Sequence, residues 1–378
     1  MTTRQEGRRS QGSETCFHGG AFFEAVGDDF QTLERSASII NADVLDAWFP
    51  PAPAVLDALN EYLPWLLRTS PPADAAGLIR TIVEVRNVPT DSVLAGAGSS
   101  ALIYLAFREW LTPTSRVLLL DPTYGEYAHV CERVVGCRVD RLTLRRENDY
   151  AVDLAELEDR LLREYDLAVI VNPNNPTGQA MPSGELAEVL AGVSSRTRIW
   201  VDEAYLEYSG QPSLESFAAE CENVVVCKSL SKVYALSGIR AAYLVGHPAM
   251  ISPLRKWTPP WAVGLPAQVA AVAALRAPDY YAARRNETSA LRTELASAIQ
   301  SHDPEIDVID GCGNYVLFHL PESGLNAAEL VARCRAEGLF IRNAGGMGTS
   351  LGDGAVRIAV KDRTTQWRIV EIVGRALG

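Results

Sequence analysis

Short apolar runs and amphipathic segments alternate along the chain from about residue 75 to residue 245. Apolar residues recur at helical spacing in Asp74–Val88 and again in Ala101–Leu111, which predicts a helix in each segment. Between such segments lie short, nearly continuous apolar runs, a pattern typical of strands buried on both faces. These predicted strands are Ser92–Ala95, Arg116–Leu120, Leu167–Val171, Ile199–Val201, Val224–Cys227 and Ala242–Val245. The alternation predicts an α/β fold in which a mostly parallel sheet carries helices on both faces.

The pattern changes after about residue 265. Ala267–Gln300 is rich in alanine, with arginine and glutamate at mixed spacing, and it predicts one long helix. Strands are then predicted at Glu305–Val308, Asn314–Leu320, Phe340–Arg342 and Ala355–Val360, with helices at Ala327–Glu337 and at the C-terminus. This order predicts a second, smaller α+β domain. We therefore expect a disordered arm (1–14), a segment joining the small domain and the active-site rim (15–70), a large domain (71–265) and a small C-terminal domain (266–378).

Composition and charge exclude several classes of function. A chain of 378 residues is long enough for two domains. Its net charge of −12 argues against non-specific binding to nucleic acid or to an anionic membrane, since both need a basic surface. No run of 18 apolar residues occurs, and the first 14 residues are polar, so neither a membrane span nor a signal peptide is expected. The seven cysteines are scattered without metal-binding spacing, which favours a reduced, cytoplasmic protein without a metal site.

Four polar clusters fall at the ends of predicted strands, where ligands bind in open α/β sheets. Ser99 and Ser100 open a helix whose free N–H groups suit a phosphate, although a plain helix cap would use the same residues. Asp202 offers a carboxylate that would keep a pyridine nitrogen protonated, or one that merely caps the following turn. The other clusters are Asn172–Gly178, which a bare turn would also explain, and the loop from Ser229 to Arg240.

The loop from Ser229 to Arg240 contains the most specific candidate chemistry. Lys232 follows two hydroxyl side chains, Ser229 and Ser231, and it precedes Arg240. An amine beside a phosphate-binding cluster is what a pyridoxal phosphate enzyme needs, because the lysine forms a Schiff base with the cofactor. Taken alone, the segment is equally compatible with a surface lysine in a serine-rich loop.

The four clusters together resemble those of the fold-type I pyridoxal phosphate enzymes, the superfamily that contains the class I and II aminotransferases. The resemblance rests on the order and spacing of Asn175, Asp202, Lys232 and Arg240. It covers residues 75–378 well and residues 15–70 loosely. The branch it resembles most contains histidinol-phosphate aminotransferase and threonine-phosphate decarboxylase. The resemblance implies a large cofactor-binding domain with a mostly parallel sheet, a smaller C-terminal domain and a homodimer.

The resemblance also implies a role for each cofactor-site residue. Lys232 would form the Schiff base and move a proton at the substrate Cα, while Asp202 would pair with the pyridinium nitrogen. Tyr124 would stack on the cofactor ring and belong to the catalytic set. The remaining implied contacts are Asn175 and Tyr205 with the ring oxygen, Ser99, Ser100, Ser229, Ser231 and Arg240 with the phosphate, and Arg357 with the substrate α-carboxylate.

On the substrate side the sequence departs from this family pattern. Ser70 stands where the branch has a tyrosine that reaches the partner subunit, and Ile40–Trp48 replaces its Asn-Glu-Asn-Pro turn. His18, Gly19 and Gly20 resemble a segment that closes over substrate phosphate in the decarboxylase, although an incidental histidine in an arm would look the same. Two further candidate substrate-binding residues are Arg342, which matches an arginine that reaches a distal phosphate or is only a surface residue, and Asn314.

The cofactor motifs do not choose among reactions, because the bound cofactor stabilises a carbanion formed by breaking any suitably aligned Cα bond. The first hypothesis is an aminotransferase acting on an amino acid or an amino-alcohol phosphate. The second is a decarboxylase or lyase on the same scaffold, which the resemblance of His18-Gly19-Gly20 and the serine at position 70 favour. A third is a pyridoxal phosphate-binding domain without catalytic activity. In each case the expected ligands are small molecules.

Overall fold

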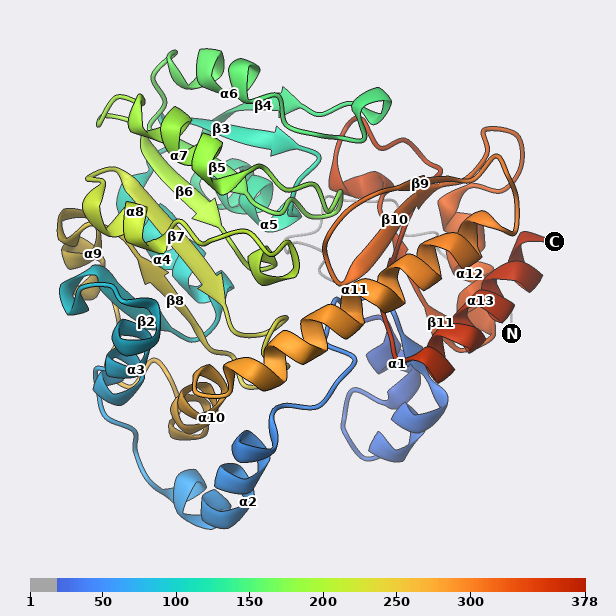
Figure 1. The fold of residues 1–378 in the computed structure, drawn as a ribbon, viewed down its shortest axis with the longest axis horizontal. Coiled ribbons are helices and arrows are strands. Elements are labelled where there is room, and N and C mark those ends of the chain that lie inside the picture. Colours follow the sequence, from blue (N-terminus) through green and yellow to red (C-terminus); the bar gives the residue numbers. More distant parts are fainter. Residues whose placement is uncertain (1–18) are drawn as a thin grey trace, which may run out of the picture.

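The computed structural model describes residues 19–378, so the predicted arm at 1–14 and the candidate His18 lie outside the described residues. Two sheets of different size define the two halves of the molecule in Figure 1. The larger sheet has seven strands in the order β2-β8-β7-β6-β5-β3-β4. β8 runs antiparallel to both of its neighbours, β2 and β7, and the other strand pairs of that sheet are parallel. The predicted mostly parallel α/β sheet is therefore confirmed.

The strands of the larger sheet form where the sequence is continuously apolar. Both faces of the sheet are covered, so each residue of such a strand is buried whichever way it points. The bounds are Val93–Gly96 (β2), Arg116–Asp121 (β3), Arg138–Thr143 (β4), Leu167–Val171 (β5), Arg198–Asp202 (β6), Val224–Ser229 (β7) and Ala242–Val245 (β8). β4 was not predicted, because its arginines and aspartate lie on a partly exposed edge strand.

Helices cover both faces of this sheet, and alternate residues of one strand enter different cores. In β6, Ile199 and Val201 pack in one hydrophobic cluster, while Trp200 packs in another with Phe107 of α4. The helices of this half are α3 (Ala76–Arg86), α4 (Ser99–Trp110), α5 (Gly125–Ala128), α6 (Leu154–Leu161), α7 (Ser183–Ala191), α8 (Glu215–Glu220), α9 (Pro248–Arg255) and α10 (Leu265–Leu275). The side chains packed between the sheet and its helices fix the positions of the strand ends.

The register of the strands brings polar residues to one edge of the sheet. Asp202 at the end of β6 lies opposite Val171 of β5 on one side and Cys227 of β7 on the other. The chain that follows these neighbours contains Asn175 and Ser229. Parallel strands end at the same edge, so residues far apart in sequence converge beyond it.

The smaller half is built on an antiparallel sheet of four strands in the order β12-β13-β10-β9. Their bounds are Asp307–Ile309 (β9), Tyr315–His319 (β10), Arg342–Asn343 (β12) and Ala355–Ala359 (β13). The helices α11 (Pro278–Gln300), α12 (Ala327–Ala336) and α13 (Arg363–Leu377) pack on it. Figure 1 shows α11 running from beside α10 to the small half.

The N-terminal segment reaches both halves. After α1 (Phe22–Val26), β1 (Ile40–Asn41) pairs in parallel with β11 (Leu339–Phe340) of the small half. The next helix, α2 (Pro53–Arg68), packs against α10. The chain between β1 and α2 therefore crosses the junction of the two halves.

Two predictions in the C-terminal half are wrong. The single helix expected over Ala267–Gln300 is two helices, because Pro278 cannot donate a backbone hydrogen bond and holds Ala277 out of the helical conformation. The strand expected at Phe340–Arg342 is also two elements. Leu339–Phe340 pairs with β1, whereas Arg342–Asn343 pairs with β13 in the four-stranded sheet.

Candidate active site

A cavity of about 770 Å³ opens beyond the carboxyl ends of β3, β5 and β6 and reaches the small half. It is lined by most of the residues singled out in the sequence. These are Ser99, Ser100, Tyr124, Asn175, Asp202, Tyr205, Ser229, Ser231, Lys232, Arg240, Arg342 and Arg357. Gly19, Gly20 and Asn314 do not line it. Convergent polar groups in one large cavity are the usual mark of a binding site.

Lys232 follows β7 in a loop that Tyr208 fixes by donating a 3.1 Å hydrogen bond to the backbone oxygen of Lys232. The Nζ atom lies 3.1 Å from Oδ1 of Asp46. Burial lowers the pKa of the Lys232 amine, and the nearby positive charge of Arg357 acts in the same direction, while Asp46 opposes both. An amine with a lowered pKa is easier to deprotonate, as a nucleophile or proton carrier must be.

Asp202 is the buried carboxylate of the site. Its Oδ2 accepts a 2.6 Å hydrogen bond from the Tyr127 hydroxyl, and its Oδ1 accepts one of 2.9 Å from the backbone N–H of Ala204. Trp200 Nε1 donates in turn to the Tyr127 oxygen at 2.9 Å. Burial raises the pKa of Asp202, and the hydrogen bond from Tyr127 opposes that shift. A cationic ring nitrogen beside Asp202 would stabilise the carboxylate further.

A cradle for a phosphate lies at the N-terminus of α4. Gly98, the residue before this helix, has φ +90°, and a Cβ atom there would come 2.5 Å from Nη2 of Arg240. Glycine therefore lets the guanidinium approach the helix N-terminus, where free N–H groups favour an anion. Arg240 Nη1 donates to Ser231 Oγ at 3.3 Å and to Ser237 O at 3.0 Å. This donor set fits the phosphate of pyridoxal phosphate.

Arg357 in β13 points from the small half into the cavity. Its Nη1 donates to Asn175 Oδ1 at 2.6 Å, and its Nη2 donates to the backbone oxygen of Asp43 at 2.9 Å. Its Nε is buried and makes no hydrogen bond within the described residues. The arginine is thus anchored by neutral acceptors and keeps its charge available for a carboxylate. Contact of Asn175 with a cofactor oxygen, through its Nδ2 donor, stays a prediction.

Two tyrosines, Tyr124 and Tyr205, also line the cavity. Tyr124 packs edge-on against Tyr127 with 5.8 Å between ring centroids, and its hydroxyl donates to Glu126 Oε2 at 3.3 Å. Ser100 Oγ donates to the same oxygen at 3.4 Å. Tyr205 packs edge-on against Tyr315 at 5.6 Å. These contacts fix two aromatic rings at the cavity wall.

The remaining substrate candidates lie at the junction of the two halves. Arg342 Nε is 2.7 Å from Asp43 Oδ1, and the backbone N–H of Gly20 donates to Asp43 Oδ2 at 3.3 Å. Asn314 Nδ2 donates to the backbone oxygen of Leu45 at 3.1 Å. Asn314 therefore positions Leu45, which lines the cavity, and its own contact with a substrate stays a prediction.

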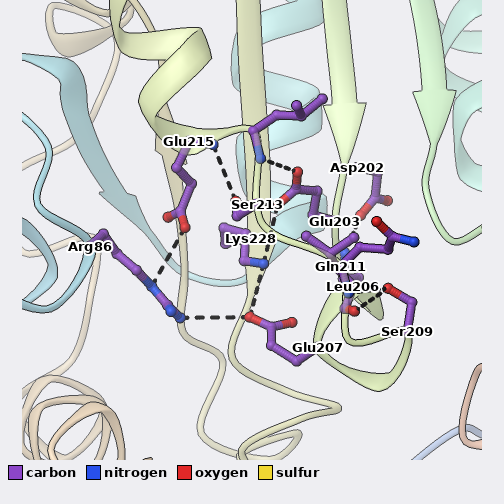
Figure 2. A network of polar contacts seen from close by, with 12 residues as sticks. Arg86, Asp202, Glu203, Leu206, Glu207, Ser209, Gln211, Ser213, Glu215 and Lys228 are labelled. Atoms are coloured by element: carbon purple, nitrogen blue, oxygen red, sulfur yellow. Dashed lines mark hydrogen bonds and ion pairs between the residues drawn. The ribbon is translucent and has the colours of Figure 1, made fainter. Parts of the chain in front are cut away.

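A buried ion network lies next to the cofactor residues in sequence (Figure 2). Lys228 Nζ contacts Glu207 at 2.9 Å and Glu203 at 3.3 Å, and Arg86 lies 3.6 Å from both Glu207 and Glu215. Burial disfavours the charge of Lys228, but the two glutamates outweigh it and raise its pKa. Lys228 precedes Ser229 and Glu203 follows Asp202, so this network fixes the ends of β7 and β6 behind the site.

Several residues of the site carried no local signal in the sequence. Asp43 and Asp46 stand in the segment that departs from the family pattern, but their partners lie in distant strands and loops. Tyr127 lies three residues after the predicted Tyr124 and faces Asp202 through α5. Spacing along a helix was the only clue to Tyr127. The described residues hold no group of three or more His, Cys, Asp or Glu side chains arranged for a metal.

Comparison with known proteins identifies the family and the fold. The family model of class I and II aminotransferases matches residues 51–373. The chain is 29% identical over 315 residues to histidinol-phosphate aminotransferase 2 of Gluconobacter oxydans, covering 82% of this chain and 84% of that enzyme. It is 30% identical over 334 residues to an aromatic amino acid aminotransferase of Thermobifida fusca, covering 88% of each. In fold it resembles histidinol-phosphate aminotransferase of Sinorhizobium meliloti in complex with pyridoxal-5'-phosphate (TM-score 0.82, 20% identity, 97% of this chain and 99% of that one).

Proposed function

The chain belongs to the class I and II aminotransferase family and is a pyridoxal phosphate-dependent enzyme, and from this premise we propose that Lys232 is its cofactor-bonding lysine. The reaction moves the α-amino group of an amino donor to a keto acid. The observation that supports the site is the convergence of Lys232, Asp202 and Arg357 on one cavity from three separate segments. Each of the three has a distinct task.

Lys232 works at the substrate Cα. When bound, pyridoxal phosphate supplies an electron sink that stabilises negative charge at that carbon. The Nζ atom accepts the Cα proton when neutral and returns it later, which is general acid–base catalysis by a positioned amine. Asp46 holds Nζ at 3.1 Å, which keeps the amine in the cavity when it carries a proton. Burial lowers its pKa and thereby favours the neutral form.

Asp202 and Arg357 hold the two ends of the reacting system. Asp202 keeps a proton on the ring nitrogen, because its carboxylate is buried and offers its charge to that N–H. Tyr127 and Trp200 fix the orientation of that carboxylate. Arg357 binds the α-carboxylate of the substrate as a planar donor of two hydrogen bonds. The scissile Cα–H bond is thereby aimed at Lys232.

The other predicted residues bind and orient the cofactor. Arg240 and the N-terminus of α4 supply hydrogen bonds and positive charge to its phosphate, with Ser229 and Ser231 beside them. Tyr124 packs on the ring, and the Asn175 amide and the Tyr205 hydroxyl donate to the ring oxygen. Fixed donors of this kind need no reorganisation during the reaction.

We also expect a homodimer and a cytoplasmic location. Helix α2 leaves large apolar side chains exposed, which supports self-association: Leu56, Tyr62, Leu63, Trp65 and Leu67. The six cysteines at 131, 137, 221, 227, 312 and 334 are all unpaired, which suits a reducing compartment. No helix within residues 19–378 is long and apolar enough to cross a membrane.

The test of the function is the half-reaction with an amino donor alone. Purified enzyme is loaded with pyridoxal phosphate and mixed with single amino acids, and both the cofactor absorbance and the released keto acid are measured. We expect conversion of the cofactor to its amine form with one keto acid per site. Release of CO₂ with an unchanged cofactor would instead show the decarboxylase reaction.

A further inference from the structure

Arg342 lines the cavity and belongs to a buried ion pair. Nε of Arg342 in β12 lies 2.7 Å from Oδ1 of Asp43, and the two side chains are 7% and 6% exposed. Taking the proposed aminotransferase function as its basis, we propose that Asp43 neutralises Arg342, so that the substrate is an α-amino acid whose carboxylate is its only anion. A substrate with a distal phosphate is thereby excluded.

Asp43 is held in place from three sides. Arg357 Nη2 donates to its backbone oxygen at 2.9 Å, and the backbone N–H of Gly20 donates to its Oδ2 at 3.3 Å. A Cβ atom on Gly19 would lie 2.5 Å from both Arg342 Nη2 and Asp43 Oδ2. The bare main chain of Gly19 and Gly20 therefore lies directly against the pair and covers it. A carboxylate fixed in this way does not move aside at low cost.

The other cations that line the cavity within residues 19–378 have tasks or acidic partners. Arg141 Nη2 lies 2.6 Å from Glu132 Oε1, and its Nε is 3.9 Å from Asp121. Lys232 contacts Asp46. Arg240 belongs to the phosphate cradle of the cofactor. Within residues 19–378 Arg357 donates to neutral acceptors, the oxygens of Asn175 and Asp43 and the sulfur of Met347, and it is the cation that remains for a substrate anion.

A phosphate at the distal end would meet Asp43 as a like charge. To reach Arg342 it would have to displace the carboxylate and leave it buried without a partner, which is strongly unfavourable. A side chain without charge faces no such penalty. Val44, Leu45 and Met347 line the same cavity and offer apolar contact. The site thus fits an amino acid with an uncharged side chain.

The experiment compares donors that differ in the distal group. Values of kcat/KM are measured for L-phenylalanine, L-leucine and L-methionine and for O-phospho-L-serine and O-phospho-L-threonine. We expect the donors with uncharged side chains to be preferred by at least about tenfold, because the carboxylate of Asp43 repels a phosphate. Equal or better use of the phosphorylated donors would overturn the inference and leave the aminotransferase function intact. Failure of every donor to convert the cofactor would count against the function itself.

The variant Asp43→Asn assigns the selectivity to this residue. It keeps the shape of the side chain and removes the negative charge beside Arg342. We expect the ratio of kcat/KM for phosphorylated over uncharged donors to rise by about 10- to 100-fold, the effect of one charge-assisted contact. The control Asp29→Asn changes an exposed carboxylate that accepts from the Gln31 backbone, and it should leave the ratio unchanged. An unaltered ratio in Asp43→Asn would refute the assignment. Should that variant not fold, the wild-type donor comparison alone decides.

Discussion

Tyr127 donates a 2.6 Å hydrogen bond to Asp202 inside the core, where both the hydroxyl and the carboxylate are buried. The Tyr127 oxygen also accepts from Trp200 Nε1, so a chain of donors ends on the carboxylate that we assign to the cofactor nitrogen. A hydrogen bond to a buried charge is worth more than one at the surface. The pair links the packing of the large sheet to the electrostatics of the site.

The first prediction concerns Tyr127→Phe. Loss of the hydrogen bond to Asp202 should cost about 1.5–3 kcal/mol, which corresponds to a fall in kcat/KM of roughly 10- to 100-fold. The dissociation constant of pyridoxal phosphate, measured by fluorescence, should rise in the same variant. Tyr280→Phe is the matched control, because Tyr280 donates to Pro50 and does not line the cavity. A normal cofactor affinity in Tyr127→Phe would show that its role is structural only.

The second prediction concerns the phosphate cradle. Gly98→Ala places a methyl group 2.5 Å from the Arg240 guanidinium and strains a backbone at φ +90°. Strain of this kind costs about 1–3 kcal/mol, so the cofactor dissociation constant should rise by about tenfold or more. Gly184→Ala is the control, since a Cβ there meets nothing within 4 Å. Unchanged cofactor affinity in Gly98→Ala would show that the cofactor phosphate does not bind at the N-terminus of α4.

The third prediction tests the buried ion network. Lys228→Met leaves Glu203 and Glu207 without their cation, and it should lower the free energy of unfolding by about 3–5 kcal/mol. Lys256→Met removes an exposed ion pair with Glu109 and should cost at most about 1 kcal/mol. Urea denaturation of the two variants gives the comparison. Equal losses would mean that the network contributes no more than a surface pair.

The fourth prediction is a pH dependence of stability from His319. This residue is 2% exposed and lies 3.0 Å from the Tyr150 hydroxyl, and burial lowers its pKa from 6.5 to about 4. As the pH falls through this range, the unfolded chain binds a proton that the folded chain does not. Stability should therefore fall between pH 6.5 and pH 4, by about 3 kcal/mol from this group.

The variant His319→Asn isolates that contribution from those of the carboxylates. The difference in unfolding free energy between wild type and variant is measured by urea denaturation at several pH values. As the pH drops from 6.5 towards 4, the wild type should lose stability relative to the variant. Below pH 4 the difference between the two should stay constant. A difference that does not change with pH would contradict the neutral state assigned to His319.

The sequence predicted the large sheet well because its strands have an unambiguous local pattern. Leu167–Val171 is continuously apolar, and it forms β5 with those bounds. The prediction of one helix over Ala267–Gln300 was wrong at Pro278. The short apolar stretches on both sides of this proline gave no sign of the break. The edge strand β4 carries charged residues and so looked like a loop.

The candidate site was likewise predicted in part from the sequence. Asp202 and Lys232 were found because each follows a strand in a recognisable order, and the register then brings them together. Asp46 contacts Lys232 across 186 residues of sequence, and Asp43 finds Arg342 across the junction of the two halves. Such pairs depend on how the small half packs on the large one, which no local pattern encodes. The sequence matched Arg342 to an arginine that reaches a distal phosphate or to a surface residue, and it gave no sign that Asp43 lies beside Arg342.

The most direct test of the account follows the Cα proton. The donor identified in the half-reaction is prepared with deuterium at Cα, and its loss to solvent is measured by mass spectrometry for wild type and for Lys232→Ala loaded with pyridoxal phosphate. Wild type should exchange the deuterium, and the variant should do so at least about 10²–10⁴-fold more slowly. Exchange by Lys232→Ala at the wild-type rate would contradict the role given to this lysine.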